Sequence, residues 1–292
     1  MATEFKIPLH RFDTNLLPPE ARQVGTEAFK TAVLMHFAAE YAAQGQTAMV
    51  TVDDEDITVM AFPAESSALD FVLPMLKAGK ISEAVPYLES LTKSAPANAN
   101  VLYNLGICYN ELEQFDEAII RLKRAVQLEP AHAHAWVGIG NAYHRMRKPE
   151  QALEAFEQAV RVDPNDGYTR RNLGGMLIGF KRIDAALVHL RKALELMPDD
   201  PQSIFGLATA LDEAGRSIEG AAAFARAREL TQDWIGREPN NGKARMLMAR
   251  LCMQEGRLDD VLAEYRVATR LLPEDPAVFQ ALGETLDRLG AR

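Results

Sequence analysis

Cysteine is scarce in this chain of 292 residues, which contains only Cys108 and Cys252. Two cysteines cannot build the disulfide framework on which small secreted domains depend. Both lie in apolar segments with helical spacing, where a free cysteine usually behaves as a small hydrophobic residue. We therefore expect no catalytic or metal-ligating cysteine, and the scarcity favours a reducing, cytoplasmic setting.

Long hydrophobic runs and an excess of positive charge are missing as well. No stretch approaches the roughly eighteen consecutive apolar residues that a membrane-spanning helix needs. The opening "MATEFKIPLHRF" lacks the basic-then-apolar pattern of a secretory signal. The net charge of -9 and the pI near 5.3 argue against nucleic acid or an anionic membrane as the main partner. The sequence thus predicts no nucleic-acid binding and no membrane insertion.

Internal repetition is what the sequence has in abundance. Prolines recur every 34 residues at 96, 130, 164 and 198, and again between Pro239 and Pro273, after one interval of 41. A fixed period of this length is typical of stacked structural repeats. Units counted from Glu65 fall at 65–98, 99–132, 133–166, 167–200, 201–241 and 242–275, followed by a half unit at 276–292. We expect this half unit to cap the last repeat, because Phe279, Leu282 and Leu286 fall at helical spacing and can cover its exposed end.

Each unit places small residues at fixed positions. The eighth place holds Gly106, Gly140 and Gly174 in three successive units, and the apolar residues around them follow helical spacing. A short polar turn follows, and Pro149 suits the first turn of a second helix. The pattern predicts helix hairpins that approach closely at the small residues and stack on their neighbours.

The units resemble the tetratricopeptide repeat. "AWVGIGNAYHRMRKPEQALEAFEQAVRVDP" and "VLYNLGICYNELEQFDEAIIRLKRAVQLEP" fill the family's aromatic, Leu-Gly, Tyr, Ala, Phe, Ala and Pro places in order, with minor exchanges, and the resemblance covers 65–292. It implies a mainly α fold, a right-handed α-solenoid of about six and a half hairpins. It also implies a concave groove, lined by the first helix of each repeat, that receives a peptide or a helix of a partner protein.

Residues 1–62 break the period and predict a small β-α-β-β unit. "FKIPLHRF" indicates an edge strand, "PPEARQVGTEAFKTAVLMHFAAEYAAQG" a helix with proline at its start, and "TAMVTV" with "ITVMAF" a hairpin. This part carries four basic and nine acidic residues up to position 64. The acidic run 53–56 lacks the Gly and later Glu of an EF-hand and indicates a solvated turn. Homodimerisation, partner docking and capping of the first repeat remain open as its role.

The stretch "AHAHAWVGIGNAYHRM" resembles a ligand site at first sight. Its Gly-x-Gly falls inside a predicted helix, whereas a phosphate loop needs a strand before the glycines. His132 and His134 flank the boundary of two units, and His144 follows ten residues later without a nearby ligand at metal spacing. We expect two turn residues and one groove residue, and no metal and no cofactor.

The expected groove residues follow from helical geometry, because the second, fifth, ninth and twelfth places of a unit share one face. They combine aromatic anchors, amides and arginines, a mixture that suits recognition of acidic or aromatic determinants on a peptide. The resemblance adds Asn104 and Asn172, where some members of the family hold a peptide backbone with asparagine. The predicted groove residues are Tyr103, Asn104, Asn110, His134, Asn141, His144, Arg145, Tyr168, Arg171, Asn172, Phe205, Lys243, Met246 and Arg250.

Repeat five contains seven extra residues around "TQDWIGREPNN". Seven residues are close to two helical turns, so they predict a second helix longer by about 10 Å. Trp234 would then pack on its own turn or serve as a second contact point for a partner, and the sequence leaves both open.

These features together predict a non-enzymatic scaffold or adaptor that binds a peptide or helix of another protein. A secretion or pilus-assembly chaperone would use the same groove on an apolar client helix. An enzyme is the alternative from another class, with its chemistry in the N-terminal unit or at His144 and Arg145. No nucleophile–base pair or metal set is recognisable in the sequence, so we expect no catalysis.

Overall fold

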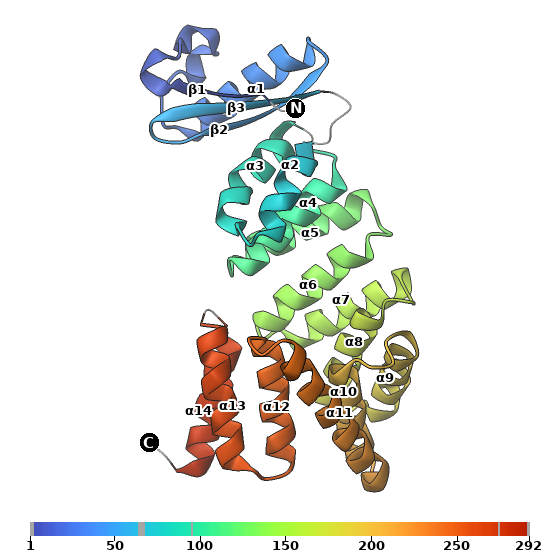
Figure 1. Ribbon diagram of the computed structural model, residues 1–292. Helices are drawn as coiled ribbons and strands as arrows, with labels where there is room; N and C mark the ends of the chain where they lie inside the picture. Colours follow the sequence, from blue (N-terminus) through green and yellow to red (C-terminus); the bar gives the residue numbers. More distant parts are fainter. Residues whose placement is uncertain (1–2, 64–67, 95, 274, 291–292) are drawn as a thin grey trace. The chain divides into compact units, whose positions relative to one another are not determined.

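The computed structural model describes residues 3–63, 68–94, 96–273 and 275–290. The chain divides into two compact units, Met1–Val162 and Asp163–Arg292. Helices dominate both, and a small sheet lies at the start of the first (Figure 1). Within the described residues, no helix is long and apolar enough to cross a membrane. The sequence predicts a domain boundary between residues 62 and 65, and the division after Val162 lies elsewhere. The predicted domain boundary stays a prediction.

The N-terminal part of unit 1 is a three-stranded antiparallel sheet with one helix. The elements are β1 (Thr3–Pro8), α1 (Glu27–Ala42), β2 (Gln46–Val52) and β3 (Asp56–Pro63), and the strand order is β1-β3-β2. The predicted hairpin is therefore present as β2 and β3. The predicted edge strand is present as β1, which ends at Pro8 because proline cannot donate to a ladder and the chain then enters a 3-10 turn at Leu9–Arg11.

The sequence predicts a helix that begins at Pro18 and Pro19, and this predicted start is wrong. Short 3-10 turns occupy Thr14–Leu16 and Pro19–Ala21, and α1 begins only at Glu27. Gly25 has a left-handed backbone with φ of 86°, which interrupts any continuous helix. The side chain of Thr26 then accepts a hydrogen bond from the backbone N–H of Phe29 and caps the new helix.

The sheet packs on both faces. On one face Val50, Ile57 and Val59 pack against α1 through Phe29 and Phe37. The other face contributes Met49, Met60 and Phe62 to a core that continues into the first repeats. The N-terminal part and the first helices of unit 1 consequently share one hydrophobic core.

Helix hairpins make up the rest of unit 1. They are α2 (Ala68–Lys77), α3 (Ile81–Ser94), α4 (Ala99–Glu111), α5 (Phe115–Leu128), α6 (Ala133–Arg145) and α7 (Pro149–Val162). Pro149 occupies the first position of α7, as the sequence predicts. Adjacent helices pack in chain order, with α4 on α5, α5 on α6 and α6 on α7.

Unit 2 continues the same pattern. Its helices are α8 (Gly167–Gly179), α9 (Ile183–Leu196), α10 (Pro201–Glu213), α11 (Ser217–Arg237), α12 (Gly242–Gln254), α13 (Leu258–Leu271) and α14 (Pro276–Leu289). The described residues from 68 to 290 contain no strand, in agreement with the predicted all-helical repeats. The α11 helix has 21 residues, whereas α9 and α13 have 14, so the seven extra residues of repeat five lengthen its second helix as predicted.

The small residues at the eighth place lie where paired helices touch. A Cβ atom on Gly106 would lie 2.6 Å from Leu122 Cγ, and one on Gly140 would lie 2.9 Å from Phe156 Cε1. Real side chains do not approach so closely, so the hairpin spacing depends on glycine at these places. The neighbouring Gly138 has a different contact, because its Cβ would lie 3.0 Å from Leu122 Cδ1 of the preceding repeat.

The helix α14 packs on α13, although not with the residues that the sequence suggests. Val278 is fully buried in a cluster with Val261 and Tyr265, and Leu282 is partly buried there. The prediction that Phe279 covers the end of repeat six is wrong, since its side chain is 49% exposed. The buried face of α14 therefore begins at Val278, one residue before Phe279, where the periodicity places it.

Candidate functional site

The candidate surface is the side of the repeats formed by their first helices. In unit 1 the first helices α4 and α6 contact each other, and in unit 2 α8 contacts α10. Where the next first helix lies in the same unit, a second helix packs against both that helix and its own partner. Close first helices with more widely spaced second helices make the first-helix face the inner side of each unit. We call this surface the inner face.

An aromatic cluster marks the inner face of unit 1. The ring centroids of Tyr103 and His132 lie 4.7 Å apart, and His134 lies 6.5 Å from Tyr103. Burial raises the pKa of the Tyr103 hydroxyl and lowers the pKa of His132. His134 is exposed, so this cluster presents an imidazole edge to solvent beside an aromatic ring.

His132 has a structural task that the sequence did not suggest. Its Nδ1 accepts a hydrogen bond of 3.2 Å from the backbone N–H of Ala135 and thereby caps α6. In each of the other described units the last residue is Asn or Asp, and its side chain caps the first helix of the next unit in the same way. These caps are Asn98, Asp166, Asp200, Asn241 and Asp275. Aligning the units on their final place could have revealed this role.

Two predicted groove residues of unit 1 instead hold the first helices together. Asn110 is only 6% exposed and donates from Nδ2 to the carbonyl of Gly138, at 2.9 Å. Arg145 Nη1 donates to the carbonyl of Asn110 at 2.8 Å, and its Nη2 lies 2.5 Å from Glu113 Oε1. The guanidinium also lies over Phe115. These contacts join α4 and α6. Asn110 is therefore not a surface contact, whereas Arg145 is engaged in this network with 35% of its side chain exposed.

The remaining unit 1 candidates differ in how accessible they are. Asn104 is half-buried, and its Nδ2 donates to the carbonyl of Asn100 within its own helix, at 2.8 Å. Asn141 and His144 are exposed on α6. The alternative of chemistry at His144 and Arg145 stays a prediction.

Unit 2 places an exposed aromatic ring beside a fixed arginine. Tyr168 is 61% exposed on α8, and Arg171 Cζ lies 5.2 Å from the centroid of its ring. Arg171 also forms an ion pair of 3.2 Å with Asp200, the residue that caps α10. Both charged side chains are largely buried, at 21% and 16% exposed. Asn172 is half-buried next to them in sequence.

A second group of candidates lies on α10 and α12 of unit 2. Phe205 is 4% exposed and packs edge-on against Phe224 of α11, so it belongs to the core and not to the surface. Arg250 Cζ lies 4.3 Å from the centroid of the Phe205 ring. Lys243 and Arg250 are exposed, and Met246 is half-buried between them along α12. Among the described residues, neither basic side chain forms an ion pair.

Trp234 lies in the added turns of α11 and is half-buried. Its backbone carbonyl accepts the capping hydrogen bond from Glu238 N–H at 2.9 Å. Both packing on its own turn and a contact with a partner fit this exposure, so its role as a second contact stays a prediction.

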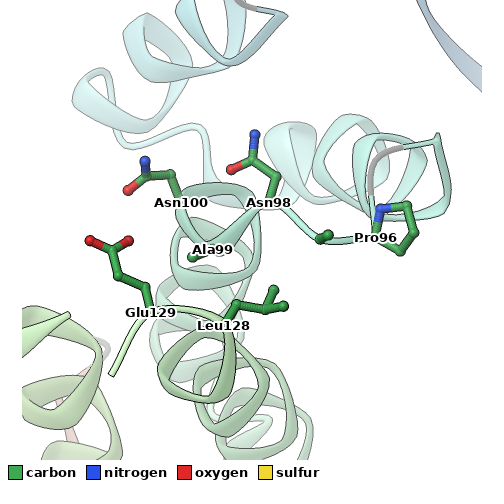
Figure 2. A pocket seen from close by; sticks show the side chains of 7 residues that line it. Pro96, Asn98, Ala99, Asn100, Leu128 and Glu129 are labelled. Atoms are coloured by element: carbon green, nitrogen blue, oxygen red, sulfur yellow. The ribbon is translucent and has the colours of Figure 1, made fainter. Parts of the chain in front are cut away.

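A hollow of about 610 Å³ lies at the start of α4, between Pro96, Asn100, Leu128 and Glu129 (Figure 2). One of its amides has a local role, since Asn98 caps α4. Within the part of the chain that the structure describes, no three His, Cys, Asp or Glu side chains gather as a metal site would require. The hollow assembles no recognisable catalytic group.

Comparison with known proteins agrees with this geometry. Three family models, each described as tetratricopeptide repeat, match residues 99–165, 137–201 and 219–284. No curated protein sequence matches the chain. A solved structure of MamA AMB-1 is 25% identical with a TM-score of 0.51, covering 57% of this chain and 99% of that one.

A second solved structure, of MamA from Desulfovibrio magneticus RS-1, is 21% identical with a TM-score of 0.51 and covers 57% of this chain and 94% of that one. The second likeness concerns the fold alone. The repeat period, the glycine contacts between paired helices, the capped first helices and the three family matches lead to one conclusion. The chain belongs to the tetratricopeptide repeat family.

Proposed function

We propose that this protein is a non-enzymatic interaction module that binds a peptide or helix of a partner protein on its inner face. The observation that carries the proposal is the pair of Tyr168 and Arg171 in unit 2. An exposed aromatic ring with a guanidinium fixed beside it is the kind of anchor that dominates protein interfaces. The ion pair with Asp200 holds Arg171 in place before binding, which lowers the entropy cost of association.

The α12 helix suggests the chemistry of the partner. Lys243, Met246 and Arg250 follow at intervals of three and four residues and therefore share one face of the helix. The two basic residues are separated by about 10 Å along the helix axis, at 1.5 Å per residue. A partner segment with acidic side chains on either side of an apolar one would complement this row.

The test uses a partner captured with the intact protein and a binding assay on the purified pair. Changing Tyr168→Ala together with Arg171→Ala should weaken binding by about 2 kcal/mol or more, the loss typical of an interface hot spot. Folding should persist because Asp200 keeps its capping bond to the N–H of Ser203.

Val188→Ala is the matched control, since Val188 is 64% exposed on the second helix α9. This control should bind like the unchanged protein. If the double variant and the control bind the partner with equal affinity, the binding site does not include Tyr168 and Arg171. Trp234 and the N-terminal part would then be the next surfaces to test.

A further inference from the structure

The two edges of the N-terminal sheet have different surroundings. The outer edge of β2 is covered by α3, where the backbone N–H of Val50 donates to Ser90 Oγ at 2.9 Å. The strand β1 forms the other edge, and within the described residues β3 is the only strand that pairs with it, while α1 packs against its Phe5 side chain. The sheet thus has one protected edge and one open edge.

The outward groups of β1 can be identified from the ladder. The backbone N–H of Leu9 donates to the carbonyl of Glu55 at 2.8 Å, so this position faces the hairpin. Backbone groups alternate along a strand, which turns Phe5 toward β3 as well and turns Glu4 and Lys6 away from it. No described residue hydrogen-bonds to the outward backbone groups of these two residues. An unpaired N–H and C=O at each is a template for another strand.

We propose that a second copy of this chain pairs its β1 with this edge, antiparallel and centred on Phe5, so that two sheets join into one of six strands. In this register Glu4 of each copy lies opposite Lys6 of the other. Both are outward-facing residues, so each pair can exchange two backbone hydrogen bonds. Both side chains are exposed, and each carboxylate meets an ammonium group across the strands.

The neighbouring registers are worse on physical grounds. Centring the pair on Lys6 places two lysines opposite each other and brings Pro8, which has no N–H, opposite Glu4. Centring it on Glu4 places two glutamates opposite each other. A shift by one residue places the outward N–H and C=O groups of one strand opposite residues whose backbone groups point toward β3. The backbone hydrogen bonds between the two β1 strands then cannot form. Among these neighbouring registers, the Phe5-centred one satisfies hydrogen bonds and charges together.

The charge pattern also distinguishes this edge from an edge protected against pairing. Lysine and proline on an edge strand usually prevent association. Here Glu4, two residues before Lys6, makes the strand complementary to itself when it is reversed.

Phe5 adds an apolar centre to the proposed interface. The ring is half-buried, with its centroid 6.4 Å from Phe37 and 6.3 Å from Tyr41 of α1. In the proposed dimer the two Phe5 side chains face each other at the position without hydrogen bonds, where opposing Cβ atoms come within about 4.5–5.5 Å. A single strand pair makes a small interface, so we expect a weak dimer that depends on concentration.

Sedimentation velocity of the full chain over a wide concentration range tests the proposal. The mass should rise from the monomer value of 32.3 kDa toward twice that value. Glu4→Lys alone or Lys6→Glu alone places like charges opposite each other and should raise the dissociation constant about ten-fold or more. The double variant Glu4→Lys with Lys6→Glu restores opposite charges and should recover the dimer.

Lys148→Glu provides a control with the same change in net charge as Lys6→Glu, at an exposed site between α6 and α7 within one repeat. It should leave the dissociation constant unchanged. Hydrogen exchange gives an independent readout, because the amides of Glu4 and Lys6 should become protected only as the dimer forms, while overall protection reports folding. A chain that stays monomeric at every concentration overturns the proposal. So does a dimer that the single variants do not weaken, or that the double variant does not recover.

Discussion

At the scale of single residues, the two glycines of the 138–140 stretch illustrate what this fold needs. Gly140 allows the helices of one hairpin to approach, and Gly138 accommodates Leu122 of the preceding repeat. The same arrangement recurs in unit 2, where Gly174 and Gly206 both lie against Leu190. A Gly-x-Gly that resembles a phosphate loop is thus two separate packing contacts within one helix.

The adjacent glycines of α8 give a matched pair for testing this packing. A Cβ on Gly174 would lie 2.6 Å from Cγ of the fully buried Leu190, whereas a Cβ on Gly175 would meet nothing within 4 Å. Both alanine variants gain the same helix propensity, about 0.5–1 kcal/mol. Gly174→Ala should therefore unfold more easily than Gly175→Ala by about 1–3 kcal/mol in urea titrations, through overpacking. Equal midpoints would show that the hairpin does not need glycine there.

At the scale of elements, the capping residues explain how each first helix begins. Five of the first helices described above begin after an Asn or Asp, and α6 begins after His132. An imidazole can accept the N–H of Ala135 on Nδ1 only while that nitrogen carries no proton. The start of α6 is therefore the one described first-helix cap that depends on a histidine.

This cap predicts a dependence of stability on pH. Burial lowers the pKa of His132 below its ordinary value near 6.5. The contribution of the cap is then fully present above that ordinary value and is lost as the pH falls through the lower folded-state pKa. Losing an N-cap costs about 0.5–2 kcal/mol.

Denaturant titrations at neutral and mildly acidic pH measure this loss. His132→Asn supplies a cap that does not titrate and should remove this part of the acid sensitivity. If this variant loses stability with acid as steeply as the unchanged protein, another group is responsible.

At the scale of the whole molecule, the C-terminal helix should protect the end of unit 2. Deleting residues 276–292 exposes the cluster around Val261 and Tyr265 that Val278 covers. At about 1.5–3 kcal/mol for a fully buried aliphatic side chain, the loss should reach a few kcal/mol and lower the melting temperature. Phe279→Ala, on the exposed side of α14, should change it little. If the truncated protein has the same melting temperature as the unchanged protein, α14 does not cap the repeats and is better explained as an arm for interaction.

The sequence by itself determined the repeat architecture, the close helix contacts, the added turns of α11 and the hairpin of the N-terminal part. These features depend on local spacing, which recurs along the chain and can be counted. Only the tertiary structure decided which polar side chains remain available. Asn110 and His144 both hold the twelfth place of their units, yet His144 is exposed and Asn110 is engaged between α4 and α6. Phe205 is likewise buried because Phe224 packs against it from the next helix. Periodicity places a residue on a face, but the neighbouring helix determines whether that position is surface or interior.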